Sequence, residues 1–299
     1  MNSQSISSPK ISIVVISYNM GRELPRTLYS LSPMMQVGVS GDEYEVIVVD
    51  NGSTEHLDIE ALQLWDGVRV HEMENPTVSP AQAVNVGLSL ARGDYCGVMV
   101  DGARMVSPGL VANTLKAFRL GERSIVATLG FHLGPDFQPL SVKHGYNKEV
   151  EDRLLEGVAW KEDGYRLFSI SVFAGSSRNG WFEPFAESNA LFMAKDLWRE
   201  LDGCDERFML PGGGLVNLDL FARACILPNI ELLVLLGEGT FHQVHGGIAT
   251  NDPEYDWQTM QDEYRKIRGE NFSCPVITPY YFGKVNNEVK ASLFNSTSE

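Results

Sequence analysis

Three short runs of apolar and β-branched residues in the first hundred positions constrain the fold more than any other feature of the sequence. They are residues 11–17 (ISIVVIS), 44–49 (YEVIVV) and 95–100 (YCGVMV). Runs of this kind are typical of strands that are buried on both faces of a sheet. Segments with helical periodicity lie between them, at 23–31, 58–65 and 79–92. Because strands alternate with helices, the sequence predicts a mainly parallel sheet with right-handed crossovers.

The rest of the chain carries the same signals less regularly. Further strands are predicted at 68–71, 124–129, 167–173, 188–194 and 230–236, and further helices at 107–120, 148–158, 195–201, 216–224 and 253–268. The last of these helices is amphipathic, and we expect Trp257, Met260, Tyr264 and Ile267 to face inward. Residues 131–187 mix glycine, proline and aromatic residues, which is typical of loops that set specificity.

Composition and charge exclude several classes of function. The formal net charge is −15 and Lys and Arg never form a cluster longer than a pair, so nucleic acid is not an expected partner. An anionic ligand would need local positive charge, from Arg22, Arg104 or a metal ion. The first residues do not resemble a secretory signal, and no apolar run is long enough for a transmembrane segment. The four scattered cysteines form no CxxC pair, which favours a reduced, cytoplasmic location.

Polar residues follow each of the three apolar runs, at the edge of the sheet where open α/β proteins bind ligands. Ser17, Tyr18 and Asn19 follow the first run, where a dinucleotide-binding fold would have GxGxxG. A hydroxyl, an aromatic face and an amide suit a nucleoside better than a pyrophosphate.

The other two runs end in carboxylates. Asp50 precedes Asn51 and Gly52 and can accept a hydrogen bond from a base N–H; the alternative is a turn in which Asp50 caps the next segment. Asp101 ends the third run, and Ser107 with Pro108 is predicted to begin the following helix. The alternative for Asp101 is a solvated side chain in a turn before that helix.

The combination of these segments is more specific than its parts. The chain resembles the family-2 glycosyltransferases of GT-A fold in several segments taken together. They are VVISYN, VIVVDNGST, a helix that bears Asn85 before RGDY, the strand ending in Asp101, and DGCDERF at 202–208. The resemblance covers residues 11–109 well and 186–250 more loosely. It implies an α/β, GT-A-like (Rossmann-like) fold with a mixed, mainly parallel sheet flanked by helices. It also implies transfer of a sugar from a nucleotide-sugar donor, a UDP-sugar above all, to a saccharide or glycoconjugate hydroxyl, as in polysaccharide biosynthesis.

The resemblance also assigns expected roles to residues. Ser17, Tyr18 and Asn19 match the loop that holds the nucleotide, Asp50 matches the carboxylate that recognises the base, and Asp101 matches the first Asp of the DxD motif. Further nucleotide-binding candidates are Asn51, Gly52, Asn85, Gly102 and Arg104. The second Asp of DxD, usually the metal ligand, is replaced by Ala103, and Arg104 follows it.

Two sources of positive charge can therefore assist departure of a diphosphate. His242 and His245 in TFHQVHGG resemble the late His-Gly segment of the family and can bind Mn²⁺ or Mg²⁺ together with Asp101; the alternative is that they are packed or surface histidines. Alternatively, Arg104 replaces the metal, because its guanidinium matches a phosphate bidentately.

The catalytic base is also displaced from the expected pattern. The family's ED-x-DLxxR segment aligns with residues 216–223, which puts Asn217 at the base position, and an amide cannot accept a proton in this role. The base candidates are then Asp219, Glu187 or a histidine, and a single base predicts inversion at the anomeric carbon. The alternative role of Asp219 is an ion pair with Arg223 that pins a helix.

These assignments divide the chain into a disordered N-terminus (1–10), a nucleotide-sugar-binding half (11–109), an acceptor-binding half (110–285) and a polar C-terminal tail (286–299). A second hypothesis is a non-catalytic nucleotide-sugar-binding module that has lost the second DxD carboxylate and the base.

Overall fold

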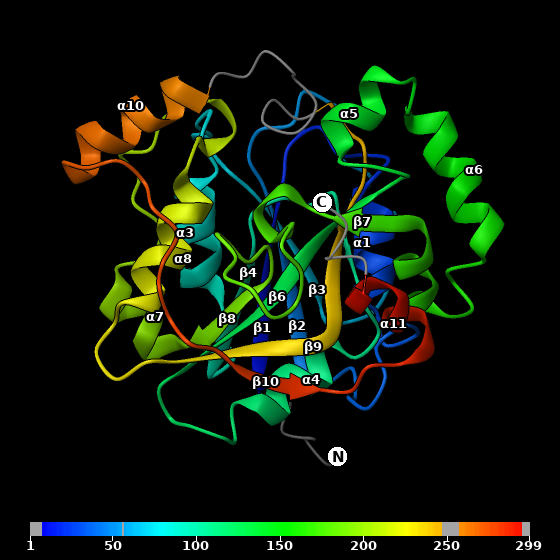
Figure 1. Ribbon diagram of the computed structural model, residues 1–299, viewed down its shortest axis with the longest axis horizontal. Helices are drawn as coiled ribbons and strands as arrows, with labels where there is room; N and C mark the ends of the chain where they lie inside the picture. Colours follow the sequence, from blue (N-terminus) through cyan, green and yellow to red (C-terminus); the bar gives the residue numbers. More distant parts are fainter. Residues whose placement is uncertain (1–7, 56, 247–256, 295–299) are drawn as a thin grey trace, which may run out of the picture.

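A computed structural model describes residues 8–55, 57–246 and 257–294 (Figure 1). The described residues form a ten-stranded sheet with helices on both faces. The strands are β1 (Ile11–Ser17), β2 (Tyr44–Asp50), β3 (Val68–Glu72), β4 (Tyr95–Met99), β5 (Arg104–Val106), β6 (Ser124–Leu133), β7 (Ser171–Phe173), β8 (Leu191–Ala194), β9 (Glu231–His242) and β10 (Tyr280–Gly283). The helices are α1 (Leu24–Leu31), α2 (Ile59–Leu62), α3 (Ala81–Leu90), α4 (Leu110–Ala117), α5 (Gln138–Lys143), α6 (Lys148–Val158), α7 (Lys195–Leu201), α8 (Val216–Cys225), α10 (Trp257–Arg268) and α11 (Asn287–Phe294).

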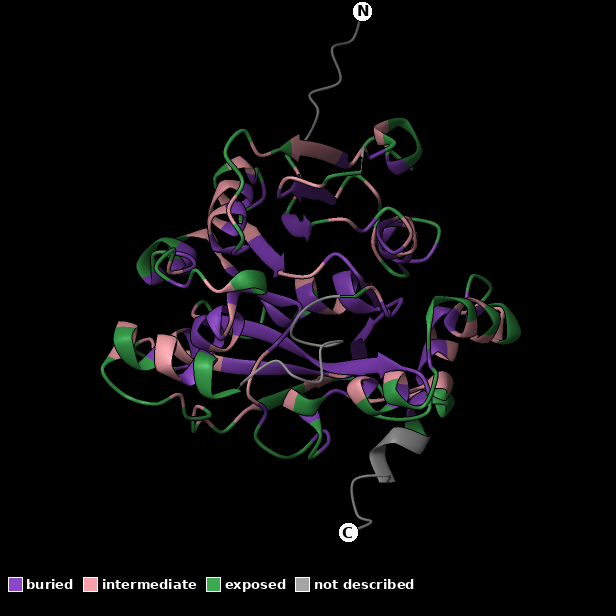
Figure 2. Ribbon diagram, turned by 90° about the horizontal axis from the view of Figure 1, so that it is seen from above, coloured by how far each residue is buried: buried purple, intermediate pink, exposed green. Residues whose placement is uncertain are grey.

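The strand order confirms a mixed, mainly parallel sheet flanked by helices. The order is β10-β9-β6-β8-β4-β1-β2-β3, with β5 paired to β9 and β7 paired to β6. Strands β3, β2, β1 and β4 are mutually parallel, whereas β8 runs antiparallel to both β4 and β6. The apolar strand residues separate into two cores, one on each face, and Figure 2 shows the central strands as almost continuously buried.

The first three predicted strands place their polar ends at one edge of the sheet. Ser17 pairs in register with Asp50, and Val15 pairs with Met99, the last residue of β4. Asp101 follows two residues later, so it lies at the same carboxyl edge as Ser17 and Asp50.

Strand β9 is longer than the sequence suggested, and β5 was not expected. The predicted strand at 230–236 continues to His242, because Glu238 and His242 of its second half are buried and have hydrogen-bond partners. In this half, Arg104 of β5 and His132 of β6 both lie opposite His242 in register. The extension therefore carries a histidine from the far half of the chain to the residues that follow Asp101.

Some local predictions are wrong. Helix α4 begins at Leu110 with Gly109 as its N-cap, not at Ser107, because the Ser107 hydroxyl donates to the buried carboxylate of Glu238 at 2.5 Å. The strand predicted at 167–173 is a 3-10 helix up to Ile170, followed by the short β7.

At the C-terminal side, Met260 and Tyr264 are buried as expected, but Trp257 is 51% exposed. The first part of that predicted helix, up to residue 256, lies outside the described residues. Within the range expected to be a polar tail, the structure has helix α11, and Val289 is fully buried. No helix in the described ranges is long and apolar enough to cross a membrane.

Candidate active site

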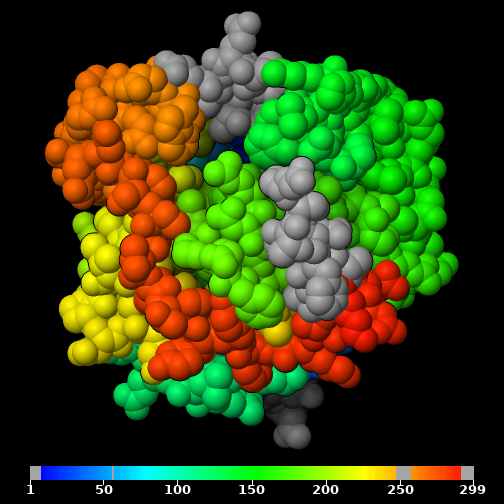
Figure 3. All heavy atoms as spheres, in the orientation of Figure 1, coloured from blue at the N-terminus to red at the C-terminus, as the bar shows by residue number. Residues whose placement is uncertain are grey.

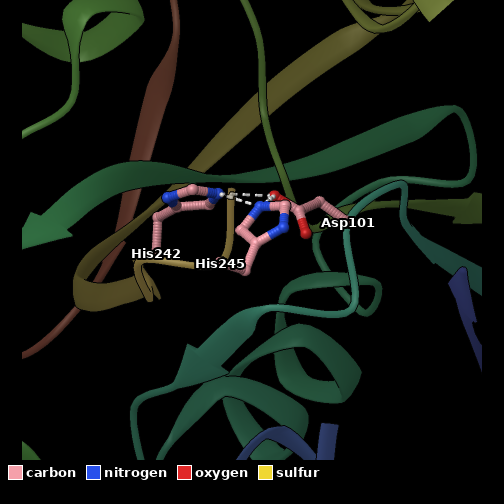
Figure 4. Close-up of side chains that lie close together, drawn as sticks. All are labelled: Asp101, His242 and His245. Carbon is pink, nitrogen blue, oxygen red and sulfur yellow. Dashed lines mark hydrogen bonds and ion pairs between the residues drawn. The ribbon is translucent and has the colours of Figure 1, made fainter. Parts of the chain in front are cut away.

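Asp101, His242 and His245 lie together at the carboxyl edge of the sheet (Figure 4). Oδ2 of Asp101 is 2.7 Å from Nε2 of His242 and 3.8 Å from Nε2 of His245. The two imidazole Nε2 atoms are 3.2 Å apart, and one ligand atom from each residue lies within 4.8 Å of the others. A carboxylate and two imidazoles that converge in this way fit a divalent cation.

The charge states of these groups suit metal ligation. Burial raises the pKa of the Asp101 carboxyl, but His242, His245 and Arg104 outweigh burial and hold this pKa well below its usual range. Burial lowers the pKa of His242 to about 4, and the neighbouring Asp101 offsets only part of this effect. Near neutral pH the site therefore offers a carboxylate and a neutral imidazole, which are the forms that bind a metal.

Arg104 lies beside this cluster and is itself buried. Its Nε atom is 3.6 Å from Oδ2 of Asp101, and only 7% of the residue is exposed. Nε and Nη1 are buried and have no hydrogen-bond partner among the described residues. Because buried N–H groups without hydrogen-bond partners are costly, Nε and Nη1 are suited to an anionic ligand that enters the site.

The chain around Asp101 is tightly packed. A Cβ atom on Gly102 would lie 2.7 Å from the carbonyl oxygen of Ile16, so only glycine allows this approach of the turn to β1. The carbonyl of Gly102 accepts a hydrogen bond from Thr27 at 2.6 Å. Ala103 is fully buried and its methyl group supplies no ligand atom.

Hydrogen bonds tie the loops after β1 and β2 to each other. Asn19 has a φ of 53°, and its Oδ1 accepts from the backbone N–H of Thr54 at 2.8 Å. The backbone N–H of Asn19 donates to Ser53, and the Ser53 hydroxyl donates to Oδ1 of Asp50 at 2.5 Å. Tyr18 projects from this joined loop and is 51% exposed.

A small cavity of about 190 Å³ opens beside these loops. Its lining residues are Asp50, Gly52, Ser53, Glu55, Leu57, Glu72 and Met73. Asn51 is not among the lining residues; its Nδ2 donates to the carbonyl of Thr77 at 2.8 Å, so it supports the loop. The side-chain oxygen of Ser17 is buried without a hydrogen-bond partner in the described chain.

The structure does not bring Asn85 to the other nucleotide-binding candidates. Its Nδ2 donates to the carbonyl of Cys204 and to Glu206, and its Oδ1 accepts from the backbone N–H of Cys204. These bonds tie α3 to the segment after α7, so both ends of the amide are occupied within the protein. Arg22, the other predicted source of charge, is also occupied, since it bonds to Glu23, Glu151 and Asp152.

Glu187 forms a second polar cluster with Asn189 and Asn217. Nδ2 of Asn217 donates to Oε2 of Glu187 at 2.5 Å and to Oδ1 of Asn189 at 3.3 Å. A Cβ atom on Gly130 would lie 3.4 Å from Nδ2 of Asn189 and 3.8 Å from Nη1 of Arg104. The Glu187 cluster and Arg104 therefore approach each other across Gly130 of β6.

Asp219 lies in a different environment. It is fully buried, its Oδ2 accepts from Nε of Arg223 at 2.8 Å, and its Oδ1 accepts from Nε of Arg268 at 2.6 Å. Nη2 of Arg268 donates to Oδ2 of Asp219 as well, and Arg268 also pairs with Asp205. Both carboxylate oxygens are thus used to hold α10 against α8.

Residues outside the cluster hold the segment that carries His242 and His245. The Val244 N–H donates to Oε2 of Glu151 at 2.8 Å, and the Val244 carbonyl accepts from Nη1 of Arg22 at 3.2 Å. His132 packs against His242 with ring centroids 5.6 Å apart. In the sequence these residues are recognisable only as polar side chains, and a hydrophobic pattern predicts that polar side chains lie on the surface.

The structure is that of an α/β protein with a small cavity and a cluster of one carboxylate and two imidazoles at the carboxyl edge of a mainly parallel sheet. A sequence model of glycosyl transferase family 2 matches residues 12–173. The chain belongs to this family, and its sheet and helices match those of GT-A glycosyltransferases. A search of curated proteins finds no match.

Solved structures with the same fold include the S. aureus protein TarS. Residues 1–349 of TarS align with a TM-score of 0.54 and 15% identity, over 88% of this chain and 67% of that one. The complex of the same fragment with UDP-GlcNAc aligns with a TM-score of 0.53 and 14% identity, over 88% and 68%. A longer TarS structure has a TM-score of 0.54 and 14% identity, and this chain covers 40% of it.

Proposed function

We propose that this protein transfers a sugar from a nucleotide-sugar donor, a UDP-sugar above all, to a hydroxyl of a saccharide or glycoconjugate acceptor. The observation that carries the proposal is the meeting of Asp101, His242 and His245 beside Arg104, whose Nε and Nη1 atoms have no hydrogen-bond partner among the described residues. A sugar-nucleotide leaving group is a diphosphate, and positive charge that is fixed near it stabilises the transition state. The UDP-GlcNAc complex of TarS supports the choice of donor.

Mn²⁺ fits the ligand set better than Mg²⁺, because two of the three ligands are imidazoles and Mg²⁺ prefers oxygen. When bound, a divalent cation neutralises negative charge on the diphosphate. Arg104 donates through Nε and Nη1 to the same phosphates, which gives its buried N–H groups partners. Asp50 and the joined loops around Asn19 and Ser53 hold the nucleoside at the cavity beside β2.

Glu187 is the base in this proposal. Its carboxylate is partly exposed, and Asn217 orients it through a short hydrogen bond. It removes the proton of the acceptor hydroxyl as that oxygen attacks the anomeric carbon from the face opposite the diphosphate, so the configuration inverts. We assign no proton transfer to Asp219, because two arginines occupy its oxygens. On the face shown in Figure 3, the segment that leads to Glu187 lies between α10 and α5.

The test is donor binding measured by thermal shift with UDP-, GDP-, dTDP- and CDP-sugars, each with Mn²⁺ and with EDTA. A ligand that binds only the native state raises the melting temperature, by an amount that depends on its affinity. We expect a Mn²⁺-dependent shift with one UDP-sugar, and no such shift for Asp101→Asn. Asp196→Asn is the matched control, because Asp196 is exposed on α7. If no nucleotide sugar shifts the wild type, the proposal is wrong.

The second hypothesis is a binding module without turnover, and the amide of Asn217 at the expected base position favours it. The two functions differ in one readout. A transferase releases nucleoside diphosphate in the presence of an acceptor, whereas a binding module shows the same thermal shift without release. We also propose a cytoplasmic location, because the four cysteines are all free.

A further inference from the structure

Gln138 lies directly behind the cluster of Asp101, His242 and His245. It is the first residue of α5, and it is fully buried although its side chain is long and polar. Its Oε1 lies 2.6 Å from Nδ1 of His242, and its backbone N–H donates to Nδ1 of His132 at 3.0 Å. A buried amide is costly unless it is hydrogen-bonded. The position of Gln138 is therefore defined by the two histidines it contacts.

The contact with Gln138 decides which nitrogen of His242 faces the site. Nδ1 of His242 is directed at Gln138, and Nε2 is directed at Oδ2 of Asp101, 2.7 Å away. A neutral imidazole carries one proton, and an amide oxygen can only accept it. With the proton on Nδ1, a lone pair on Nε2 faces the carboxylate. Two lone pairs at this distance repel each other, unless a cation lies close to both.

We infer that Gln138 is a positioning residue for the cation site: its amide oxygen holds His242 in the tautomer that presents Nε2 as a ligand. The inference rests on the proposed function, since it requires that Asp101, His242 and His245 bind a cation. Metal-ligating histidines commonly donate their second ring N–H to such a partner, which fixes both the tautomer and the orientation of the ring.

Neighbouring contacts keep Gln138 in place. His132 accepts from the Gln138 backbone and is itself stacked on Phe137, with ring centroids 5.2 Å apart. The first turn of α5 is thus attached to β6, next to the position where His242 of β9 pairs with His132. Because the backbone of Gln138 is held, its side chain can fix the ring of His242.

The two ends of the Gln138 amide differ in their contacts, and this difference allows the role of Oε1 to be tested. Nε2 of Gln138 is buried and has no hydrogen-bond partner in the described parts of the chain. Glutamate has nearly the same shape and keeps an acceptor at the Oε1 position, whereas methionine keeps the volume and loses the acceptor. Glu and Met at this position therefore separate hydrogen bonding to His242 from filling of space.

The experiment is a titration of the purified full chain with Mn²⁺, followed by the electron paramagnetic resonance signal of the free ion. We expect Gln138→Met to weaken Mn²⁺ binding by about 10–100-fold. Gln138→Glu should bind Mn²⁺ at least as tightly as the wild type. The matched control is Gln36→Met, because Gln36 is also buried and hydrogen-bonded but bonds to Ser30, Ser107 and Val111 rather than to the site. We expect this control to lower the melting temperature and leave the Mn²⁺ affinity unchanged.

The outcomes separate this inference from the proposed function. If Asp101→Asn abolishes Mn²⁺ binding and Gln138→Met binds as the wild type does, the cation site stands and the role of Gln138 is overturned. If the wild type binds no Mn²⁺, the cation site itself is overturned, and the inference with it. If Gln138→Glu loses as much affinity as Gln138→Met, an acceptor at the Oε1 position does not support the cation site, and the inference is likewise wrong. Should Gln138→Met fail to fold, the affinity of Gln138→Glu decides, since loss of binding there contradicts the inference.

Discussion

Nδ2 of Asn217 lies 2.5 Å from Oε2 of Glu187, so the amide at the expected base position holds a carboxylate from another segment. The two residues come from α8 and from the loop before β8. Glu187 thereby takes the place of Asn217 as the candidate base. It remains in the neighbourhood of Asp101 and Arg104, because Asn189 and Arg104 both flank Gly130. The predictions below follow from this arrangement and from the charges around it.

Substitution of Glu187 separates catalysis from binding. We expect Glu187→Gln to lower the turnover number by about 10²–10⁴-fold, because the amide cannot accept the proton of the acceptor hydroxyl. The dissociation constant of the donor, measured by isothermal titration calorimetry, should not change. The nearby exposed Glu183 provides the control, and Glu183→Gln should retain full turnover. Wild-type turnover in Glu187→Gln would exclude Glu187 as the base.

Substitution of Asp219 tests stability. Asp219→Asn removes the charge that faces Arg223 and Arg268, and we expect the free energy of unfolding to fall by about 2–3 kcal/mol. Chemical denaturation measures this change. Below its lowered melting temperature, the folded variant should keep the turnover number of the wild type. If it folds normally and has no turnover, Asp219 takes part in the reaction after all.

We expect Arg104 to promote the reaction of the nucleotide sugar and to weaken binding of the cation. Without its guanidinium, Arg104→Met should lower kcat/KM by about 10²–10³-fold, because the diphosphate loses fixed donors. The same variant should bind Mn²⁺ more tightly in the absence of nucleotide, because a positive charge 3.6 Å from Asp101 is gone.

Arg104→Lys is the companion variant for this prediction, since it keeps the charge but not the planar fork. It should recover only part of the lost kcat/KM. Wild-type activity that persists in EDTA and disappears in Arg104→Met would instead show that Arg104 replaces the metal.

Glu151 gives the stability of the protein a specific pH dependence. Burial raises the pKa of this carboxyl from its ordinary value of 4.5 to about 7. Between these two values the folded chain keeps a proton that the unfolded chain releases. The contribution of Glu151 therefore lowers the free energy of unfolding as pH rises from about 4.5 to about 7, by at most about 1.4 kcal/mol per pH unit.

Glu151→Gln should remove this dependence, so its stability relative to the wild type rises through that window and is level above it. Urea denaturation at several pH values measures the difference. Glu156→Gln, an exposed position on the same helix, should follow the wild type at every pH. Parallel curves for Glu151→Gln and the wild type would contradict the prediction.

Much of the fold could be predicted because its signals are local. The apolar runs that became β1, β2 and β4 contain enough β-branched residues to define a buried strand without their neighbours. The bounds of α6 and α7 agree with the predicted ranges 148–158 and 195–201, since their periodicity lies within the helices themselves. The second half of β9 was missed because its polar residues appear unfavourable until their buried partners are known, as for Glu238 with Ser107 and Tyr165.

The candidate site, too, was predictable only where its signals are local. The sequence by itself determined that Asp50 and Asp101 lie at the carboxyl ends of two buried strands, since that follows from the strand pattern alone. It also identified His242, His245 and Glu187 as groups able to ligate or to accept a proton. Only the tertiary structure decided that His242 contacts Asp101 and that two arginines bond to the carboxylate of Asp219. The same holds for the contacts of Gln138 and Glu151 with the segment that carries the histidines. These contacts join segments distant along the chain, and their distances depend on sheet register and packing, which no local pattern encodes.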